Sequence, residues 1–214
     1  MNNETIKRIF SSLILIPIVC FFIFKGSLLF TIFILFIFLI TIYEWHLLSS
    51  KRKYYLPGII FIIFSFFTVH NFRIYGDFSY FLLILVTCIA TDIGGYTFGK
   101  TFNGPKLTKI SPKKTYAGML GSFLLSIIFS YIYLNNLETL KLNNTIDYFD
   151  FRIIFTILLV SLVSQIGDLI VSFFKRKSKI KNTGKIIPGH GGILDRIDGM
   201  IFAFPFIFLL LKFL

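Results

Sequence analysis

Long runs of hydrophobic residues separated by short polar segments make up most of the chain. A helix of about 20 apolar residues can cross the hydrocarbon core of a bilayer. Runs near this length occupy residues 9–24, 27–44, 56–72, 78–98, 116–135, 152–173 and 192–213. The pattern therefore predicts an all-α, polytopic membrane bundle of about seven transmembrane helices, or as many as nine if polar stretches hide re-entrant pieces.

The composition supports this fold class. Of 214 residues, 56% are hydrophobic and 29 are Phe, and the mean hydropathy is +0.81. The 22 Lys and Arg outnumber the 10 Asp and Glu, which gives a formal charge of +12. In a soluble domain this surplus would indicate nucleic acid. Between apolar runs it indicates membrane topology and anionic ligands, so we expect the lipid bilayer and no nucleic acid as partners.

The distribution of positive charge predicts the orientation. If the N-terminus is cytoplasmic, most Lys and Arg fall on inner segments, including the two richest loops, residues 100–115 and 175–196. Cytoplasmic loops of membrane proteins carry an excess of Lys and Arg. We therefore expect a cytoplasmic N-terminus, with both basic loops on the side of the membrane where nucleotides are found.

Asp168 lies inside an apolar run. An ionisable residue at membrane depth is costly and by default indicates function. On a helix, Ser164, Asp168, Ser172 and Lys175 would form one stripe of hydroxyl, carboxylate and ammonium groups. The alternative is a carboxylate that pairs with a cation of a neighbouring helix purely for folding.

Asp195 and Asp198 are three residues apart and would share one helix face. They follow His190, Gly191 and Gly192, and small residues let the backbone approach a ligand and offer amides to anionic oxygens. Alternatively, the two carboxylates cap a helix start and His190 bonds a neighbouring carbonyl. Carboxylates that converge from two helices beside a basic loop are suited to hold a hard divalent cation against phosphates.

Two further segments have two interpretations each. Residues 111–115, Ser-Pro-Lys-Lys-Thr, either clamp phosphate with their ammonium and hydroxyl groups or begin a helix with flanking positive charge. Asp92, followed by Gly94 and Gly95, either supplies a third ligand or marks close helix packing through small residues.

Polar and aromatic residues also close the second apolar run. Glu44, Trp45 and His46 stand at its end, where the polar segment begins. Aromatic and polar side chains are common at membrane–water interfaces. We expect these three residues to be an interfacial anchor.

The segment from Ser172 to Asp198 resembles the signature of the phosphatidate cytidylyltransferase family, also called CDP-diacylglycerol synthase. The family pattern reads S-x-x-K-R-x4-K-D-x-G-x2-[LI]-P-x-H-G-G-x-x-D-R-x-D, and nearly every defined position matches. The chain departs from it at Asn182, where the pattern has Asp. A second resemblance covers residues 92–121, where the family shows S-P-K-K-T-x-E-G and this chain has Ala117 in place of Glu.

The resemblance implies a multi-pass enzyme of the bacterial inner (cell) membrane whose active site faces the cytoplasm. It would condense CTP with phosphatidic acid to CDP-diacylglycerol and pyrophosphate, using Mg²⁺ held by Asp168 and Asp195. Within one integral membrane domain, residues 1–90 would form N-terminal membrane helices, and residues 91–214 would form the catalytic helices with both basic loops. The resemblance leaves open whether a monovalent cation accompanies Mg²⁺ and whether the protein forms a homodimer.

The residue patterns and the resemblance together give one expected site. The residues expected to act in catalysis are Asp168, Asp195, Asp198, Lys175 and His190. The residues expected to bind substrate are Asp92, Ser111, Lys113, Lys114, Thr115, Ser172, Arg176, Gly191, Gly192 and Arg196.

Two other functions compete with this one. A related enzyme could use another lipid phosphate as acceptor, because substrate tails leave no readable mark in apolar residues. An ion-coupled transporter would spread acidic groups through the depth of the bilayer and show an inverted repeat. Here the strongest candidates cluster at one face and no repeat is visible, which favours the enzyme.

Overall fold

The computed structural model describes residues 3–139, 151–189 and 191–213. Within these residues all regular structure is helical, apart from two isolated β-bridges. The helices are α1 (Asn3–Lys25), α2 (Ser27–Ser49), α3 (Tyr55–Ile74), α4 (Phe78–Phe102), α5 (Tyr116–Thr139), α6 (Phe151–Lys177), α7 (Leu194–Ile197) and α8 (Met200–Phe213). The predicted all-α class is therefore confirmed.

Five helices are long and apolar enough to cross a membrane, namely α2, α3, α4, α5 and α6. The apolar parts of α1 and α8, Phe10–Lys25 and Met200–Leu211, are shorter. The last predicted run, residues 192–213, is not one helix, because the helix is interrupted at Asp198 and Gly199, between α7 and α8. Five spans with two shorter apolar helices are thus observed, and a total of seven spans stays a prediction.

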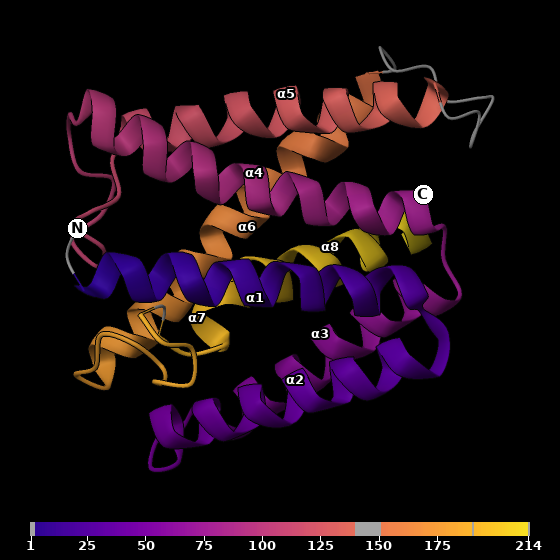
Figure 1. The fold of residues 1–214 in the computed structure, drawn as a ribbon. Helices are drawn as coiled ribbons and strands as arrows, with labels where there is room; N and C mark the ends of the chain where they lie inside the picture. The colour runs from indigo at the N-terminus through magenta and orange to yellow at the C-terminus, as the bar shows by residue number, and fades with distance from the viewer. Residues whose placement is uncertain (1–2, 140–150, 190, 214) are drawn as a thin grey trace.

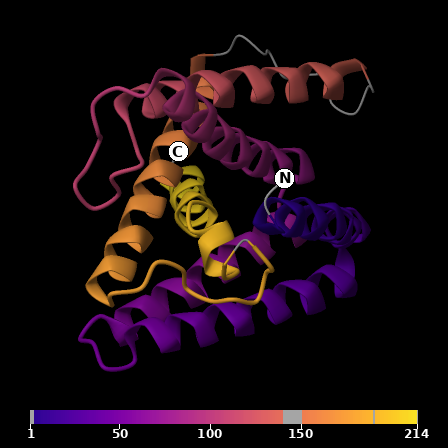
Figure 2. The same cartoon turned by 60° about the vertical axis from the view of Figure 1, so that its left-hand side comes forward.

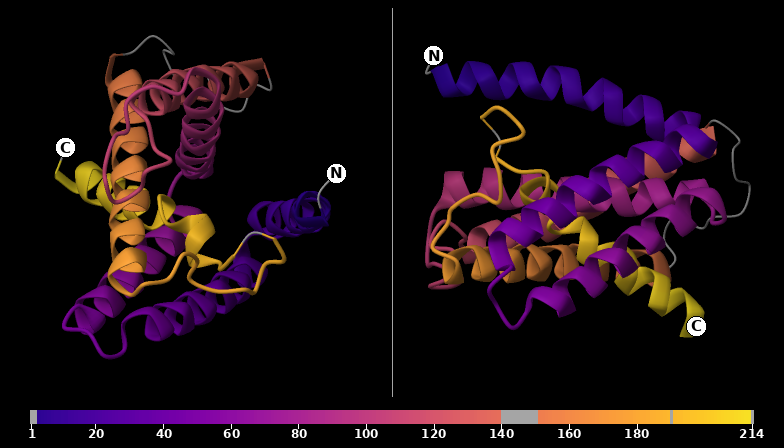
Figure 3. Two further views of the ribbon diagram at one scale, coloured as in Figure 1. Left: turned by 90° about the vertical axis from the view of Figure 1, so that its left-hand side faces the viewer. Right: turned by 90° about the horizontal axis from the view of Figure 1, so that it is seen from below.

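The helices form two antiparallel hairpins with a pair of helices between them (Figures 1 and 2). Helices α4 and α5 form one hairpin, α2 and α3 form the other, and α6 and α8 lie between them. Helix α1 runs along the outside of the bundle, as Figure 3 shows from below. An aromatic core of Phe30, Phe72, Phe81 and Phe204 joins α2, α3, α4 and α8.

Glycines bring α4 and α5 together. A Cβ atom on Gly94 would collide with the carbonyl oxygen of Gly121, and one on Gly118 would lie 2.7 Å from the carbonyl oxygen of Gly95. Small residues let helix backbones approach closely in membranes. Gly94 and Gly95 therefore serve close helix packing, which was one of the two interpretations of this segment.

Three polar connections meet at one end of the bundle. The α4–α5 loop, the α2–α3 turn and the α6–α7 loop all lie at the left-hand end of Figure 1. The predicted co-location of the two basic loops is thus observed. This end carries the candidate site.

Candidate active site

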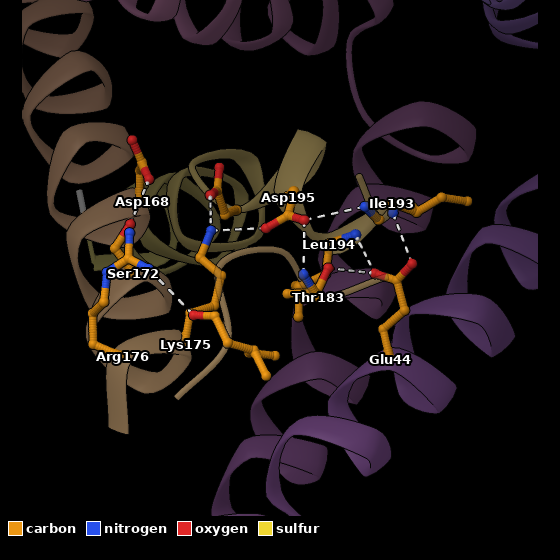
Figure 4. Close-up of polar contacts among 12 residues, drawn as sticks. Glu44, Asp168, Ser172, Lys175, Arg176, Thr183, Ile193, Leu194 and Asp195 are labelled. Atoms are coloured by element: carbon orange, nitrogen blue, oxygen red, sulfur yellow. Dashed lines mark hydrogen bonds and ion pairs between the residues drawn. The ribbon is translucent and has the colours of Figure 1, made fainter. Parts of the chain in front are cut away.

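The polar stripe predicted on α6 is present. The Ser172 hydroxyl donates to the Asp168 carboxylate at 3.3 Å, and Ser164, one turn before Asp168, is buried. Lys175, two turns beyond Asp168, is also buried and points to the α6–α7 loop and the residues after it (Figure 4). One face of α6 therefore presents a carboxylate, two hydroxyls and an ammonium group to the rest of the site.

Asp198 meets Asp168 at this face. Asp198 lies between α7 and α8, is only 6% exposed, and has its carboxyl group beside that of Asp168. Burial, together with the carboxylate of Asp168, raises the pKa of Asp198 well above its ordinary value. Two close carboxyl groups can share one proton, and a cation between them would replace that proton. Asp168 lies inside α6 and Asp198 follows α7, so the pair joins two separate elements, whereas the resemblance implied Asp195 as the second metal carboxylate.

Lys114 brings the α4–α5 loop to the same carboxylate. Its Nζ lies 2.6 Å from Asp168 Oδ2, and both side chains are roughly a quarter exposed, at 25% and 29%. The loop holds Lys114 in place by backbone hydrogen bonds, since Leu107 N–H donates to the Lys114 carbonyl and Tyr116 N–H to that of Pro105. The ion pair is therefore accessible to solvent and to anionic ligands.

Asp92 on α4 lies near Asp168 and Asp198, and we call these three carboxylates the acidic group. It is exposed and lies within electrostatic range of Asp168, Asp198, Lys114 and Arg196. Carboxylates from α4, α6 and the α7–α8 junction thus face one basic loop.

Asp195 has a different environment from Asp168. Its Oδ2 accepts hydrogen bonds from the amides of Thr183 at 2.8 Å and Gly192 at 3.1 Å, and its Oδ1 pairs with Lys175 Nζ at 2.8 Å (Figure 4). Lys175 Nζ also lies 4.0 Å from Asp198 Oδ2. Both oxygens of Asp195 are therefore engaged with the protein, and Lys175 links Asp195 to the Asp168–Asp198 pair.

The sequence interpretation of Glu44 and Trp45 as an interfacial anchor is wrong. Glu44 is fully buried at 0% exposure, and its carboxylate accepts hydrogen bonds from residues of the α6–α7 loop. Trp45 is 5% exposed and donates its indole N–H to the carbonyl of Tyr55. An acidic residue in an apolar run was the signal that singled out Asp168, and the same signal could have found Glu44.

The structure describes all but one of the remaining predicted residues. Thr115 caps α5, since its hydroxyl accepts from Gly118 N–H at 3.1 Å, while Lys113 is exposed and Ser111 N–H bonds the Thr108 hydroxyl. Arg176 donates to the carbonyl of Ile180 at 3.2 Å, and Arg196 is exposed beside the acidic group. Gly191 and Gly192 are buried, with φ of +91° at Gly191. His190 lies outside the described residues.

The donor set suits a hard divalent cation. Among the described residues, no three acidic, His or Cys side chains are arranged as a ready-made metal centre. Mg²⁺ needs fewer protein ligands, since it keeps several waters and is bound through one or two carboxylates plus substrate phosphates. The adjacent carboxyl groups of Asp168 and Asp198 meet that requirement.

Comparison with known proteins gives matches over most of the chain. A family model described as the cytidylyltransferase family matches residues 73–214, which include the α4–α5 loop, α6, α7 and α8. A Rickettsia felis protein named phosphatidate cytidylyltransferase is 36% identical over 209 residues, covering 94% of this chain and 89% of that protein.

Other bacteria have similar proteins under the same name. A Helicobacter pylori protein is 38% identical over 135 residues, which cover 62% of this chain and 47% of that protein. A Bacillus subtilis protein is 36% identical over 147 residues, which cover 68% of this chain and 52% of that protein. The family model matches about two thirds of the chain, and the Rickettsia felis protein is similar over 94% of it. The chain therefore belongs to the cytidylyltransferase family.

Proposed function

We propose that this chain is a phosphatidate cytidylyltransferase, which condenses CTP with phosphatidic acid to give CDP-diacylglycerol and pyrophosphate. The observation that carries the proposal is the 36% identity with a protein of that name over 94% of this chain. The site chemistry supports it, because carboxylates and lysines gathered at one end of an apolar bundle suit a reaction between a nucleotide and a lipid headgroup.

The proposal includes a seven-span protein of the inner membrane with a cytoplasmic N-terminus. The α4–α5 and α6–α7 loops are rich in Lys and Arg and lie at the same end of the bundle. This end would face the cytoplasm under the positive-inside rule. CTP would then reach the site from the cytoplasm, while the lipid tails of the acceptor stay in the leaflet.

Asp168 and Asp198 would hold Mg²⁺, which when bound offsets negative charge on the reacting phosphates. Asp195 was the ligand expected from the family resemblance, but its oxygens are bonded to two backbone amides and to Lys175. We therefore assign Asp195 to holding the α6–α7 loop. Asp92 faces the same basic loop from α4 and would add negative charge near the cation.

The chain's own residues would align two polyanions. An oxygen of the lipid phosphate attacks the α-phosphorus of CTP, a new P–O bond forms, and the bond to the leaving pyrophosphate breaks, so no covalent enzyme intermediate is needed. Lys114 is placed to exchange its bond with Asp168 for a substrate phosphate, because this ion pair is solvent-accessible. Lys113, Arg176 and Arg196 are exposed at the same end and would hold the outer phosphates.

The test is a direct assay with purified protein. Labelled CTP, phosphatidic acid and Mg²⁺ are incubated with protein in detergent, and the lipid phase is analysed for labelled CDP-diacylglycerol. Asp168→Asn is the matched inactive control. Absence of labelled lipid with folded wild-type protein overturns the proposal, and product formed in detergent, without any sealed compartment, excludes transport as the main function. Replacing phosphatidic acid by an isoprenoid ether lipid phosphate tests the competing acceptor.

A further inference from the structure

We infer that Glu44 on α2 is a positioning residue, which fixes the α6–α7 loop and thereby places Asp198 against Asp168. The inference rests on the proposed function for its activity readout and on the geometry for its metal-binding readout. It concerns a residue outside the family match at residues 73–214.

Glu44 bonds the start of α7 from a distant helix. Its Oε1 accepts from Ile193 N–H at 2.9 Å, and its Oε2 accepts from Leu194 N–H at 2.9 Å and from the Thr183 hydroxyl at 2.8 Å (Figure 4). The first amides of a helix need partners from outside it, and Ile193, at the N-cap position, makes no side-chain capping bond. Glu44 supplies the acceptor that the local sequence lacks.

The loop is built to admit this carboxylate. A Cβ atom on Gly184 would lie 2.6 Å from Glu44 Oε1, and one on Gly192 would collide with both carboxylate oxygens. Thr183 is 4% exposed and joins Glu44 to Asp195, since its hydroxyl donates to Glu44 and its amide to Asp195. The glycines of this loop therefore make room for Glu44, which gives them a role besides ligand approach.

The orientation of Asp198 depends on this arrangement. Only the short helix α7 separates the amides held by Glu44 from Asp198, which sits at the C-terminal end of α7. Asp198 contacts Asp168 of α6, whereas Asp195 faces the loop. Releasing the start of α7 would let Asp198 move relative to Asp168, although Glu44 touches neither residue.

The experiment compares Glu44→Gln with Thr41→Val. Glutamine has nearly the same shape as glutamate. Its amide NH₂ is a donor, however, so it cannot accept a hydrogen bond at the position where a carboxylate oxygen of Glu44 does. Thr41 lies one turn earlier on α2, is equally buried, and bonds only the Ile37 carbonyl of its own helix. Mn²⁺ binding is measured by electron paramagnetic resonance, kcat and KM are measured for both substrates, and Tm is recorded in detergent.

Glu44→Gln is expected to raise the Kd for Mn²⁺ by roughly 10- to 100-fold, the range seen when residues that orient metal ligands are removed. The kcat falls by a similar factor while KM for phosphatidic acid changes little, and Thr41→Val matches the wild type. Unchanged Mn²⁺ affinity in folded Glu44→Gln overturns the inference, and so does an equal loss in Thr41→Val.

Thr183→Val provides a second test in case Glu44→Gln fails to fold. It removes one of the three contacts to Glu44 and leaves both amide bonds, so a smaller rise in the Mn²⁺ Kd is expected. Wild-type Mn²⁺ affinity in folded Thr183→Val, with Glu44→Gln unfolded, overturns the inference. If wild-type protein binds Mn²⁺ but makes no CDP-lipid, the proposed function fails while the Glu44 comparison still decides the inference.

Discussion

The ion pairs Lys114–Asp168 and Lys175–Asp195 have similar lengths, 2.6 and 2.8 Å, but different surroundings. The side chains of the first pair are 25% and 29% exposed, and those of the second are 10% and 8% exposed. Asp195 accepts two further backbone amide bonds, whereas Asp168 has a hydroxyl and the carboxyl group of Asp198 beside it. The two pairs therefore differ in solvent access and in their fixed partners, although both join a lysine to an aspartate.

Within one site, the accessibility of each aspartate decides whether it can take part in ligand binding or only in holding the structure. A carboxylate with an accessible, exchangeable partner can accept a cation or release its lysine to a phosphate. A carboxylate surrounded by fixed donors holds a loop instead. Removing one partner of a buried pair leaves an uncompensated charge, which is far more destabilising than breaking an exposed pair. Substitutions in the two pairs should therefore affect different measurements.

The largest effect is expected for Asp168→Asn and Asp198→Asn. Each removes a proposed metal-binding carboxylate, and loss of one such electrostatic group costs roughly 10²- to 10³-fold in kcat. The fold should persist, because asparagine keeps the shape and removes repulsion between the two carboxyl groups. CDP-lipid formation and Tm are measured on the same preparations. Near-normal turnover in either variant would contradict the assignment.

Asp195→Asn should act on stability first. It removes the nearer of the two carboxylates paired with the buried Lys175 ammonium, which costs about 3 kcal/mol in the free energy of unfolding. Chemical denaturation in mixed micelles measures the loss. The double variant with Lys175→Met should recover part of it, because the buried charge is then gone. If Asp195→Asn is as stable as the wild type but inactive, Asp195 takes part in the chemistry and the contrast between the two pairs disappears.

Lys114→Met should affect substrate binding more than stability. Loss of a charged hydrogen bond to phosphate corresponds to about a tenfold increase in KM for CTP. The change in unfolding free energy should stay below about 1 kcal/mol, because the pair with Asp168 is partly exposed. Lys109→Met, at an exposed position of the same loop to which no role in binding is assigned, is the matched control. An equal rise in KM in both variants would show a general effect of loop charge.

The smallest effect is expected for Thr115→Ala. Removing the cap of α5 should lower stability by about 1 kcal/mol, since the amide of Gly118 loses its acceptor. Thr115→Asn can cap the helix and should be close to wild type in Tm. KM for CTP should follow the wild type in both variants. A rise in KM for Thr115→Asn would give the Thr115 side chain a direct role in phosphate binding.

Much of the fold was predictable from local pattern. The length of the apolar runs predicted the helices. The distribution of Lys and Arg predicted that the two basic loops lie on one side, and the structure has both loops at one end of the bundle. The α6 stripe was also predictable, because i and i+4 spacing fixes which side chains share a face. These predictions needed only residues close together in the chain.

The partner of each acidic side chain was not predictable in this way. Glu44 bonds Ile193 and Leu194 across 149 and 150 residues, and no local spacing indicates such partners. Asp195 and Asp198 looked equivalent at three residues apart, but α7 ends between them, so that one faces the loop and the other faces Asp168. Tertiary packing made this choice.

The long separation between Glu44 and its partners has a consequence for biosynthesis. During synthesis, α2 is made long before Ile193 and Leu194. A carboxylate without hydrogen-bond donors is unfavourable in hydrocarbon, so the end of α2 favours the headgroup region until α7 arrives. Glu44 therefore gains these two hydrogen bonds only after Ile193 and Leu194 have been synthesised, so the packing of an early helix depends on a segment made much later.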